Sequence, residues 1–172
     1  IDLGNKSRIK KISFIGNKIY KNRKLRSVII SEQYKFWKII SGKKFLNQNL
    51  INLDERLLKN YYLNKGYYNV EINSSFAKLV DENEFEIIFN IDAKEKVYFN
   101  NLKIDLPVDF ERENYSKIND LFQEIKGEHY SINTVEKILQ EIEVITINDQ
   151  YLSVKATVEE IIDSNKLDLV FK

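Results

Sequence analysis

The chain has 172 residues, of which 43% are hydrophobic and 31% charged, with no Cys, no Met, one His and one Trp. This composition is typical of a folded chain with one ordinary domain or two small ones. It excludes a disulfide framework, a thiolate zinc site, a cysteine nucleophile and any site that needs two imidazoles.

Charge is unevenly distributed along the chain. Residues 1–65 hold 16 Lys and Arg against 4 Asp and Glu, a net charge of +12, whereas residues 66–172 hold 11 against 22, a net charge of −11. Such an asymmetry indicates an anionic partner, or only that the two ends of the molecule differ. An AT-rich genome is a further explanation for the excess of Lys.

The sequence opens on Ile1 without a start Met, so we expect a piece of a longer protein. It contains neither a secretory signal nor an apolar run of the roughly 18 residues that a membrane-spanning helix needs. We therefore expect any targeting segment or membrane domain to lie outside these residues.

The first half of the sequence predicts the element order β-α-α-β-β. A β-prone run through Ile12 and Phe14 ends at the turn signal Gly16-Asn17. Helical spacing predicts a short helix over 22–32 and a longer helix that ends at Gly66. Two alternating strands joined by a hairpin follow. The residues that carry the longer helix and the two strands are Leu50, Leu53, Leu57 and Tyr61, then 68–76, then Phe85, Ile87, Phe89 and Ile91.

The second half repeats this order. Val135, Ile138 and Ile142 reproduce the spacing of the first long helix at a constant offset of 85 residues. A strand before this helix and a closing hairpin complete the unit. We predict an α+β fold of two tandem domains over 1–93 and 94–172, each a three-stranded mixed sheet covered by two helices. The first strand of this unit is predicted from Leu102 and Ile104, its first helix from Ile118, Leu121, Phe122 and Ile125, and its closing hairpin from the alternating Leu152, Val154, Ala156 and Val158 and the alternating Leu167, Leu169 and Phe171.

Two stretches of the first half resemble a known family. The strand and turn Ile12-Ser13-Phe14-Ile15-Gly16-Asn17 and the helix end at 57–67, with Tyr61-Tyr62 and Gly66-Tyr67, are similar to POTRA (polypeptide-transport-associated) domains of the BamA outer-membrane assembly factor family. The resemblance is to the third and fourth repeats of that family. The second unit departs from the pattern, with Leu106-Pro107 in place of Gly-Asn and Gln150 in place of Gly.

The resemblance implies a periplasmic interaction scaffold with no enzymatic activity and no cofactor or metal. The implied partners are unfolded outer-membrane proteins, accessory lipoproteins of the barrel assembly machinery and the parent protein's own membrane barrel. Its implied mechanism is β-strand addition, in which an extended segment pairs with an exposed sheet edge.

The candidate peptide-binding edge is the strand over 68–76. Because Ser74-Ser75 interrupts its alternation, a bulge is expected there, and the strand is either an open edge or an edge protected by that bulge. The candidate edge residues are Tyr68, Asn69, Val70, Glu71, Ile72, Ser74 and Phe76.

Phe36, Trp37 and Ile39 are candidates for docking an accessory protein, because they form an apolar segment within a basic stretch. The alternative, which we favour, is that Trp37 folds back to cover the helices of the first domain.

A different class of function is also compatible with the basic first half, which suggests single-stranded nucleic-acid binding by an α+β module. Because the motifs of such modules are missing, we expect no nucleic-acid partner. Sequence motifs of nucleotide-binding, hydrolase or metalloprotease sites are missing too, so we expect no enzyme.

Overall fold

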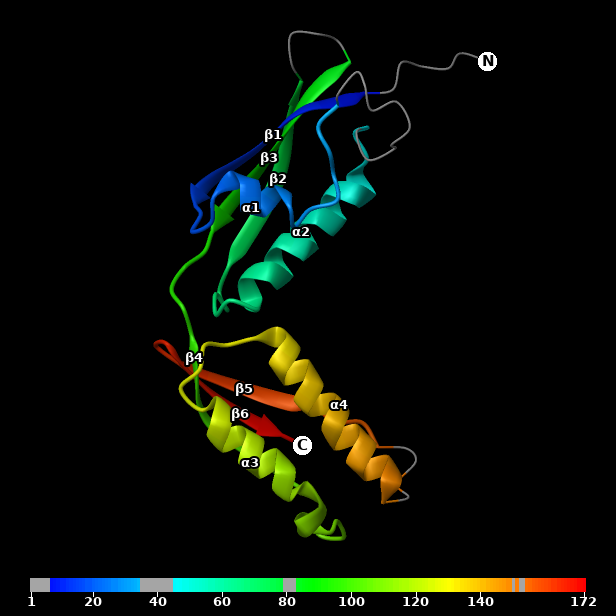
Figure 1. Cartoon of the computed structure of the whole chain (residues 1–172), viewed down its shortest axis with the longest axis vertical. Helices are drawn as coiled ribbons and strands as arrows, with labels where there is room; N and C mark the ends of the chain where they lie inside the picture. Colours follow the sequence, from blue (N-terminus) through cyan, green and yellow to red (C-terminus); the bar gives the residue numbers. More distant parts are fainter. Residues whose placement is uncertain (1–6, 35–44, 79–82, 150, 152–153) are drawn as a thin grey trace, which may run out of the picture. The chain divides into compact units, whose positions relative to one another are not determined.

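The computed structural model describes residues 7–34, 45–78, 83–149, 151 and 154–172 (Figure 1). The chain divides into two compact units. Unit 1 comprises Ile1–Tyr62 and Asn69–Lys94, and unit 2 comprises Leu63–Tyr68 and Glu95–Lys172. Each unit contains one three-stranded sheet, which confirms the predicted α+β class.

The sheet of unit 1 has β3 at its centre, parallel to β1 and antiparallel to β2. It is therefore the predicted mixed sheet, and Figure 1 shows the helices α1 and α2 on one of its faces. The elements are β1 (Arg8–Asn17), α1 (Asn22–Arg26), α2 (Gln48–Leu63), β2 (Glu71–Lys78) and β3 (Glu84–Asp92).

The core of unit 1 lies between this sheet and its helices. Alternate residues of β3, Ile87, Phe89 and Ile91, are fully buried, as the period of two in a strand requires. The ring of Phe89 stacks on Phe14 of β1 with ring centroids 5.6 Å apart. Because β2 and β1 are both paired to β3, this apolar face fixes which side of each strand faces the helices.

A buried carboxylate in α2 holds the segment that follows α1. Asp54 is fully buried and accepts hydrogen bonds from the backbone N–H of Ile30 at 2.7 Å and of Ser31 at 3.2 Å. These contacts satisfy a charged group that would be costly to bury alone. The helix α1 ends at Arg26 rather than at the predicted residue 32, because Ser27 N and Val28 N donate to carbonyl groups three residues back and the following N–H groups donate to Asp54.

Unit 2 repeats the architecture. Its sheet has the order β4-β6-β5, with β6 parallel to β4 and antiparallel to β5. Two helices, α3 and α4, complete it, and the side chain of Ser131 caps α4 by accepting from Thr134 N. The elements are β4 (Tyr98–Ile104), a 3-10 turn (Arg112–Tyr115), α3 (Ser116–Ile125), α4 (Ile132–Asn148), β5 (Val158–Asp163) and β6 (Lys166–Phe171).

The strand predicted over 152–158 is wrong in position, because β5 begins at Val158. Thr157 and Lys172 exchange backbone hydrogen bonds of 2.9 Å just before β5 begins, and the described residues 154–157 lie outside the strand.

Replacing Gly16 by Ala is expected to destabilise unit 1 by about 2–3 kcal/mol. Gly16 has a φ of +85°, and a Cβ there would lie 2.5 Å from both the side-chain oxygen of Asn90 and the backbone oxygen of Ile91. Urea unfolding followed by NMR amide signals of each unit measures this effect.

The matched control is Gly127→Ala in unit 2. Gly127 has a φ of +87°, but a Cβ there meets no described atom within 4 Å, so only the conformational cost of about 1 kcal/mol is expected. Equal losses at the two positions would contradict the steric argument for Gly16.

Candidate functional site

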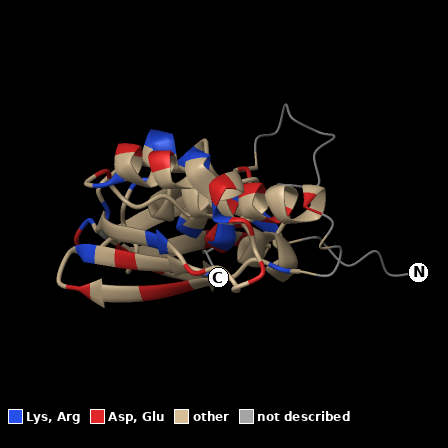
Figure 2. Cartoon of the chain, turned by 90° about the horizontal axis from the view of Figure 1, so that it is seen from below, with Lys and Arg blue, Asp and Glu red and all other residues tan. Residues whose placement is uncertain are grey.

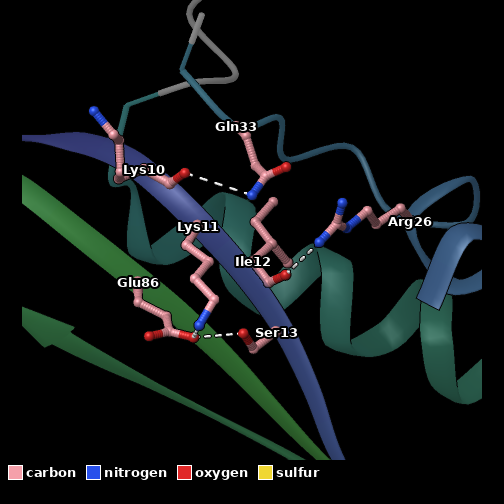
Figure 3. A network of polar contacts seen from close by, with 7 residues as sticks. All are labelled: Lys10, Lys11, Ile12, Ser13, Arg26, Gln33 and Glu86. Carbon is pink, nitrogen blue, oxygen red and sulfur yellow. Dashed lines mark hydrogen bonds and ion pairs between the residues drawn. The ribbon is translucent and has the colours of Figure 1, made fainter.

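The outer edge of β1 is covered by hydrogen bonds from the chain itself (Figure 3). Carbonyl groups along this edge already accept from side chains or from backbone that follows the strand, so another strand would have to displace these donors to pair there. The donors and acceptors are Tyr34 N to Ile9 O at 2.6 Å, Gln33 Nε2 to Lys10 O at 3.4 Å, Arg26 Nη2 to Ile12 O at 3.0 Å and Lys18 Nζ to Phe14 O at 2.7 Å.

The sheet face that turns away from the helices is polar where β1 meets β3. Glu86 accepts a hydrogen bond from Ser13 and lies 3.0 Å from the ammonium group of Lys11 (Figure 3). The hydrogen bond from Ser13, followed by that from Lys11, lowers the pKa of the Glu86 carboxyl. The group therefore remains ionised near neutral pH and keeps this face hydrophilic.

The outer edge of β2 is different. The backbone N–H of Ser74 points away from β3, since it donates to the Glu55 carboxylate of α2 rather than to the ladder. In an antiparallel pair, residues with outward N–H and C=O groups alternate with residues that pair inward. Ile72 and Phe76 therefore share the orientation of Ser74, and we call the outward backbone groups of these three residues the β2 edge.

Within the described part of the chain, one group of the β2 edge is covered. The N–H of Ser74 is occupied by Glu55, a half-buried residue, whereas the outward N–H of Ile72 meets no acceptor among the described residues. The ladder to β3 runs without interruption from Glu71 opposite Asp92 to Lys78 opposite Phe85. The predicted bulge at Ser74-Ser75 is therefore wrong, since the register has no shift there.

The predicted edge residues are only partly brought together. Ile72, Ser74 and Phe76 lie on the outward positions of β2, and Glu71 is its first residue. Tyr68, Asn69 and Val70 precede the strand, because Asp92 is the last residue of β3 and leaves them no partner. The side chain of Val70 is buried, with 4% exposure. The docking candidates Phe36, Trp37 and Ile39 lie outside the described residues.

Glu55 is the edge residue that the sequence did not predict. It lies one position after the buried Asp54 on α2, beside the apolar stripe of that helix. Its partner Ser74 is 19 residues away, so no local pattern connects the two. Only the tertiary packing of α2 beside β2 brings them together.

Tyr68 belongs to unit 2 with the rest of Leu63–Tyr68. Its hydroxyl donates to the carboxylate of Glu160 on β5, and its ring meets the edge of Tyr130 with centroids 4.9 Å apart. Burial, followed by the hydrogen bond to Glu160, raises the pKa of Tyr68 to about 12. Tyr68 therefore supports the β5 side of unit 2 rather than β2.

Unit 2 also has one covered edge. The start of β4 pairs with residues 127–130, since Gly127 N donates to Phe99 O at 2.8 Å and Phe99 N donates to Glu128 O at 2.9 Å. On β5, the pairing of Thr157 with Lys172 directs the backbone groups of Val158, Glu160 and Ile162 outward by alternation.

The strand β5 of the second sheet is charged and mostly exposed. Three of the six residues of β5 are acidic, at positions 159, 160 and 163, and Figure 2 colours the charged residues of the described part of the chain. Within the described residues, no group of three or more His, Cys, Asp or Glu is placed to hold a metal ion, and no helix is long and apolar enough to cross a membrane.

Comparison with known proteins connects this geometry to one family. Residues 7–94 match the family model described as "POTRA: Surface antigen variable number repeat". A curated relative, the outer membrane protein assembly factor BamA of Buchnera aphidicola, is 24% identical over 171 residues, which cover 96% of this chain and 27% of the relative. The BamA of Nitratidesulfovibrio vulgaris is 26% identical over 102 residues, 59% of this chain and 12% of that protein. The chain thus spans about a quarter or less of these relatives.

Solved structures show the same fold. The POTRA3-5 fragment of Haemophilus influenzae BamA matches 96% of this chain and 60% of its own with a TM-score of 0.63 and 15% identity. The POTRA1-2 part of the periplasmic domain of Omp85 from Anabaena matches 96% of this chain and 94% of its own with a TM-score of 0.56 and 10% identity. Both structures support the two-domain α+β architecture.

The contact between Tyr68 and Glu160 predicts a stability change at high pH. Because the folded-state pKa of Tyr68 is raised from 10 to about 12, its contribution is complete below pH 10 and is lost as the pH rises through about 12. The variant Tyr68→Phe should lack this part of the alkaline loss. Urea unfolding of unit 2 between pH 8 and the alkaline limit of folding, read from its amide or circular dichroism signals, compares the two proteins. Identical pH profiles for wild type and variant would contradict the assignment.

Proposed function

Because the chain belongs to the POTRA family, we propose that it is an interaction scaffold of an outer-membrane β-barrel assembly factor that binds unfolded outer-membrane protein segments by strand addition at the β2 edge. The family and the BamA relatives place the chain in the periplasmic part of an outer-membrane protein. The edge assignment goes beyond this placement and rests on the contacts of the first sheet.

The observation that carries the proposal is the difference between the two edges of this sheet. Along β1, side chains and following backbone occupy the outward carbonyl groups from Ile9 to Phe14. Along β2, the outward N–H of Ile72 has no acceptor among the described residues. An added strand needs a row of backbone donors and acceptors, so β2 is the better template of the two.

The chemistry of this edge suits a weak and sequence-tolerant interaction. Backbone groups are common to all clients, so pairing along the β2 edge discriminates little between sequences. Each net hydrogen bond contributes about 0.5–1.5 kcal/mol, while ordering an extended segment costs about 1–2 kcal/mol per residue. We therefore propose that a client binds transiently and leaves for the barrel. Docking of accessory lipoproteins, with Phe36, Trp37 and Ile39 as candidates, remains a proposal drawn from the sequence.

Replacing Ser74 by Pro tests the β2 edge. Proline removes the outward N–H of Ser74 and places its ring on the pairing side, while an edge position tolerates it without loss of a ladder hydrogen bond. We expect affinity for a peptide of about ten residues with the alternating pattern of a barrel strand to fall about 3- to 10-fold. Fluorescence anisotropy with a labelled peptide at near-physiological salt measures the loss.

The matched control is Val158→Pro at the first residue of β5, which removes an outward N–H from the other sheet and should leave the affinity of β2 unchanged. A folded Ser74→Pro protein that binds as well as wild type would show that β2 is not the accepting edge. A labelled single-stranded oligonucleotide serves as the second probe. Preferential, strongly salt-dependent binding of the oligonucleotide would instead favour the nucleic-acid alternative.

A further inference from the structure

We propose that Glu55 is an intramolecular competitor of the client strand, which occupies the central donor of the β2 edge until an incoming carbonyl group displaces it. This inference rests on the proposed function and assigns a regulatory residue to the same edge. Its basis is the hydrogen bond from the Ser74 backbone N–H to the Glu55 carboxylate.

The contact between Glu55 and Ser74 lies at the centre of the β2 edge. Ser74 lies between Ile72 and Phe76, so its N–H is the middle donor of the three that a client strand would use. A carboxylate oxygen accepts a hydrogen bond more strongly than a neutral carbonyl oxygen does. An approaching strand must therefore displace Glu55 before it can pair continuously along β2.

The surroundings of Glu55 allow it to move. The residue is only half-buried, and Ser74 N is the one partner that the described residues give it. A surface hollow of about 480 Å³ on α2 is lined by Glu55 together with Asn49, Asn52 and Arg56. This hollow offers the displaced carboxylate amide donors and a positive charge, so releasing Ser74 does not leave the carboxylate without polar neighbours.

Unit 2 provides a comparison within the same chain. There Glu143 of α4 accepts from the backbone N–H of Ala156 at 3.2 Å. Ala156 precedes β5, which begins at Val158, so this carboxylate covers no donor of that strand. Each long helix thus has a glutamate that accepts from a backbone N–H in or near its edge strand. Of these two glutamates, only Glu55 covers a donor within the strand.

The first arm of the test is independent of any client. Amide hydrogen exchange of the wild-type chain should show the Ser74 amide protected relative to the outward amide of Ile72. In Glu55→Ala the Ser74 amide should exchange at a rate comparable to that of Ile72. Unchanged protection of Ser74 in this variant would overturn the inference, whatever the peptide does.

The second arm measures affinity for the barrel-strand peptide of about ten residues. Removing the competitor in Glu55→Ala should raise affinity about 3- to 10-fold. Glu55→Gln keeps an acceptor oxygen without the charge and should lie between wild type and Glu55→Ala. Glu143→Ala is the matched control and should bind as wild type does. Thermal unfolding by circular dichroism establishes that each variant is folded, and Glu55→Gln carries the comparison if the alanine variant is not.

The outcomes separate the two proposals. If wild type binds the peptide and the folded Glu55 variants bind it with equal or lower affinity, the role of Glu55 is overturned and strand addition remains intact. Failure of wild type and all variants to bind the peptide would overturn the proposed function and, with it, the role of Glu55 as a competitor, even if the exchange arm shows that Glu55 protects the Ser74 amide.

Discussion

The structure of unit 1 depends on how the outward backbone groups of its two edge strands obtain hydrogen-bond partners. With β3 in the centre, both neighbours have an outer row of backbone groups that need partners. The chain covers the β1 row with donors from four residues that follow the strand. On the β2 row the described contacts provide a single acceptor, Glu55. This asymmetry turns an ordinary small domain into a candidate strand acceptor.

The same constraint explains why the helices carry particular polar residues. Two adjacent residues of α2 act on the two edges of the sheet. The buried Asp54 accepts from the segment after α1, and this segment contains Gln33 and Tyr34, which donate to the β1 edge. Glu55 points to the other edge of the sheet and meets Ser74. One helix thus supports both edges: through Asp54 it orders the segment that covers β1, and through Glu55 it covers one donor of β2.

The sequence predicted the elements that periodicity determines and missed those that tertiary pairing determines. The mixed sheets, the long helices and the repeat were predictable because Leu50, Leu53 and Leu57 recur as Val135, Ile138 and Ile142 at a fixed offset. The ends of strands were not, since they depend on pairing: β2 starts at Glu71, opposite Asp92 of β3, and β5 starts at Val158, opposite Phe171 of β6. Glu55 was also beyond prediction, because its contact with Ser74 crosses 19 residues without a local signature.

The most direct test is an NMR titration of the chain with the barrel-strand peptide, in which intermolecular NOEs locate the added strand. We expect NOEs between the peptide backbone and the outward amides of Ile72, Ser74 and Phe76, with a new hydrogen-bonded amide at Ile72. We expect none to the covered positions Ile12 and Phe14 of β1. NOEs to β1, or a bound peptide that contacts neither edge of this sheet, would contradict the claim that the difference between the edges determines where a client binds.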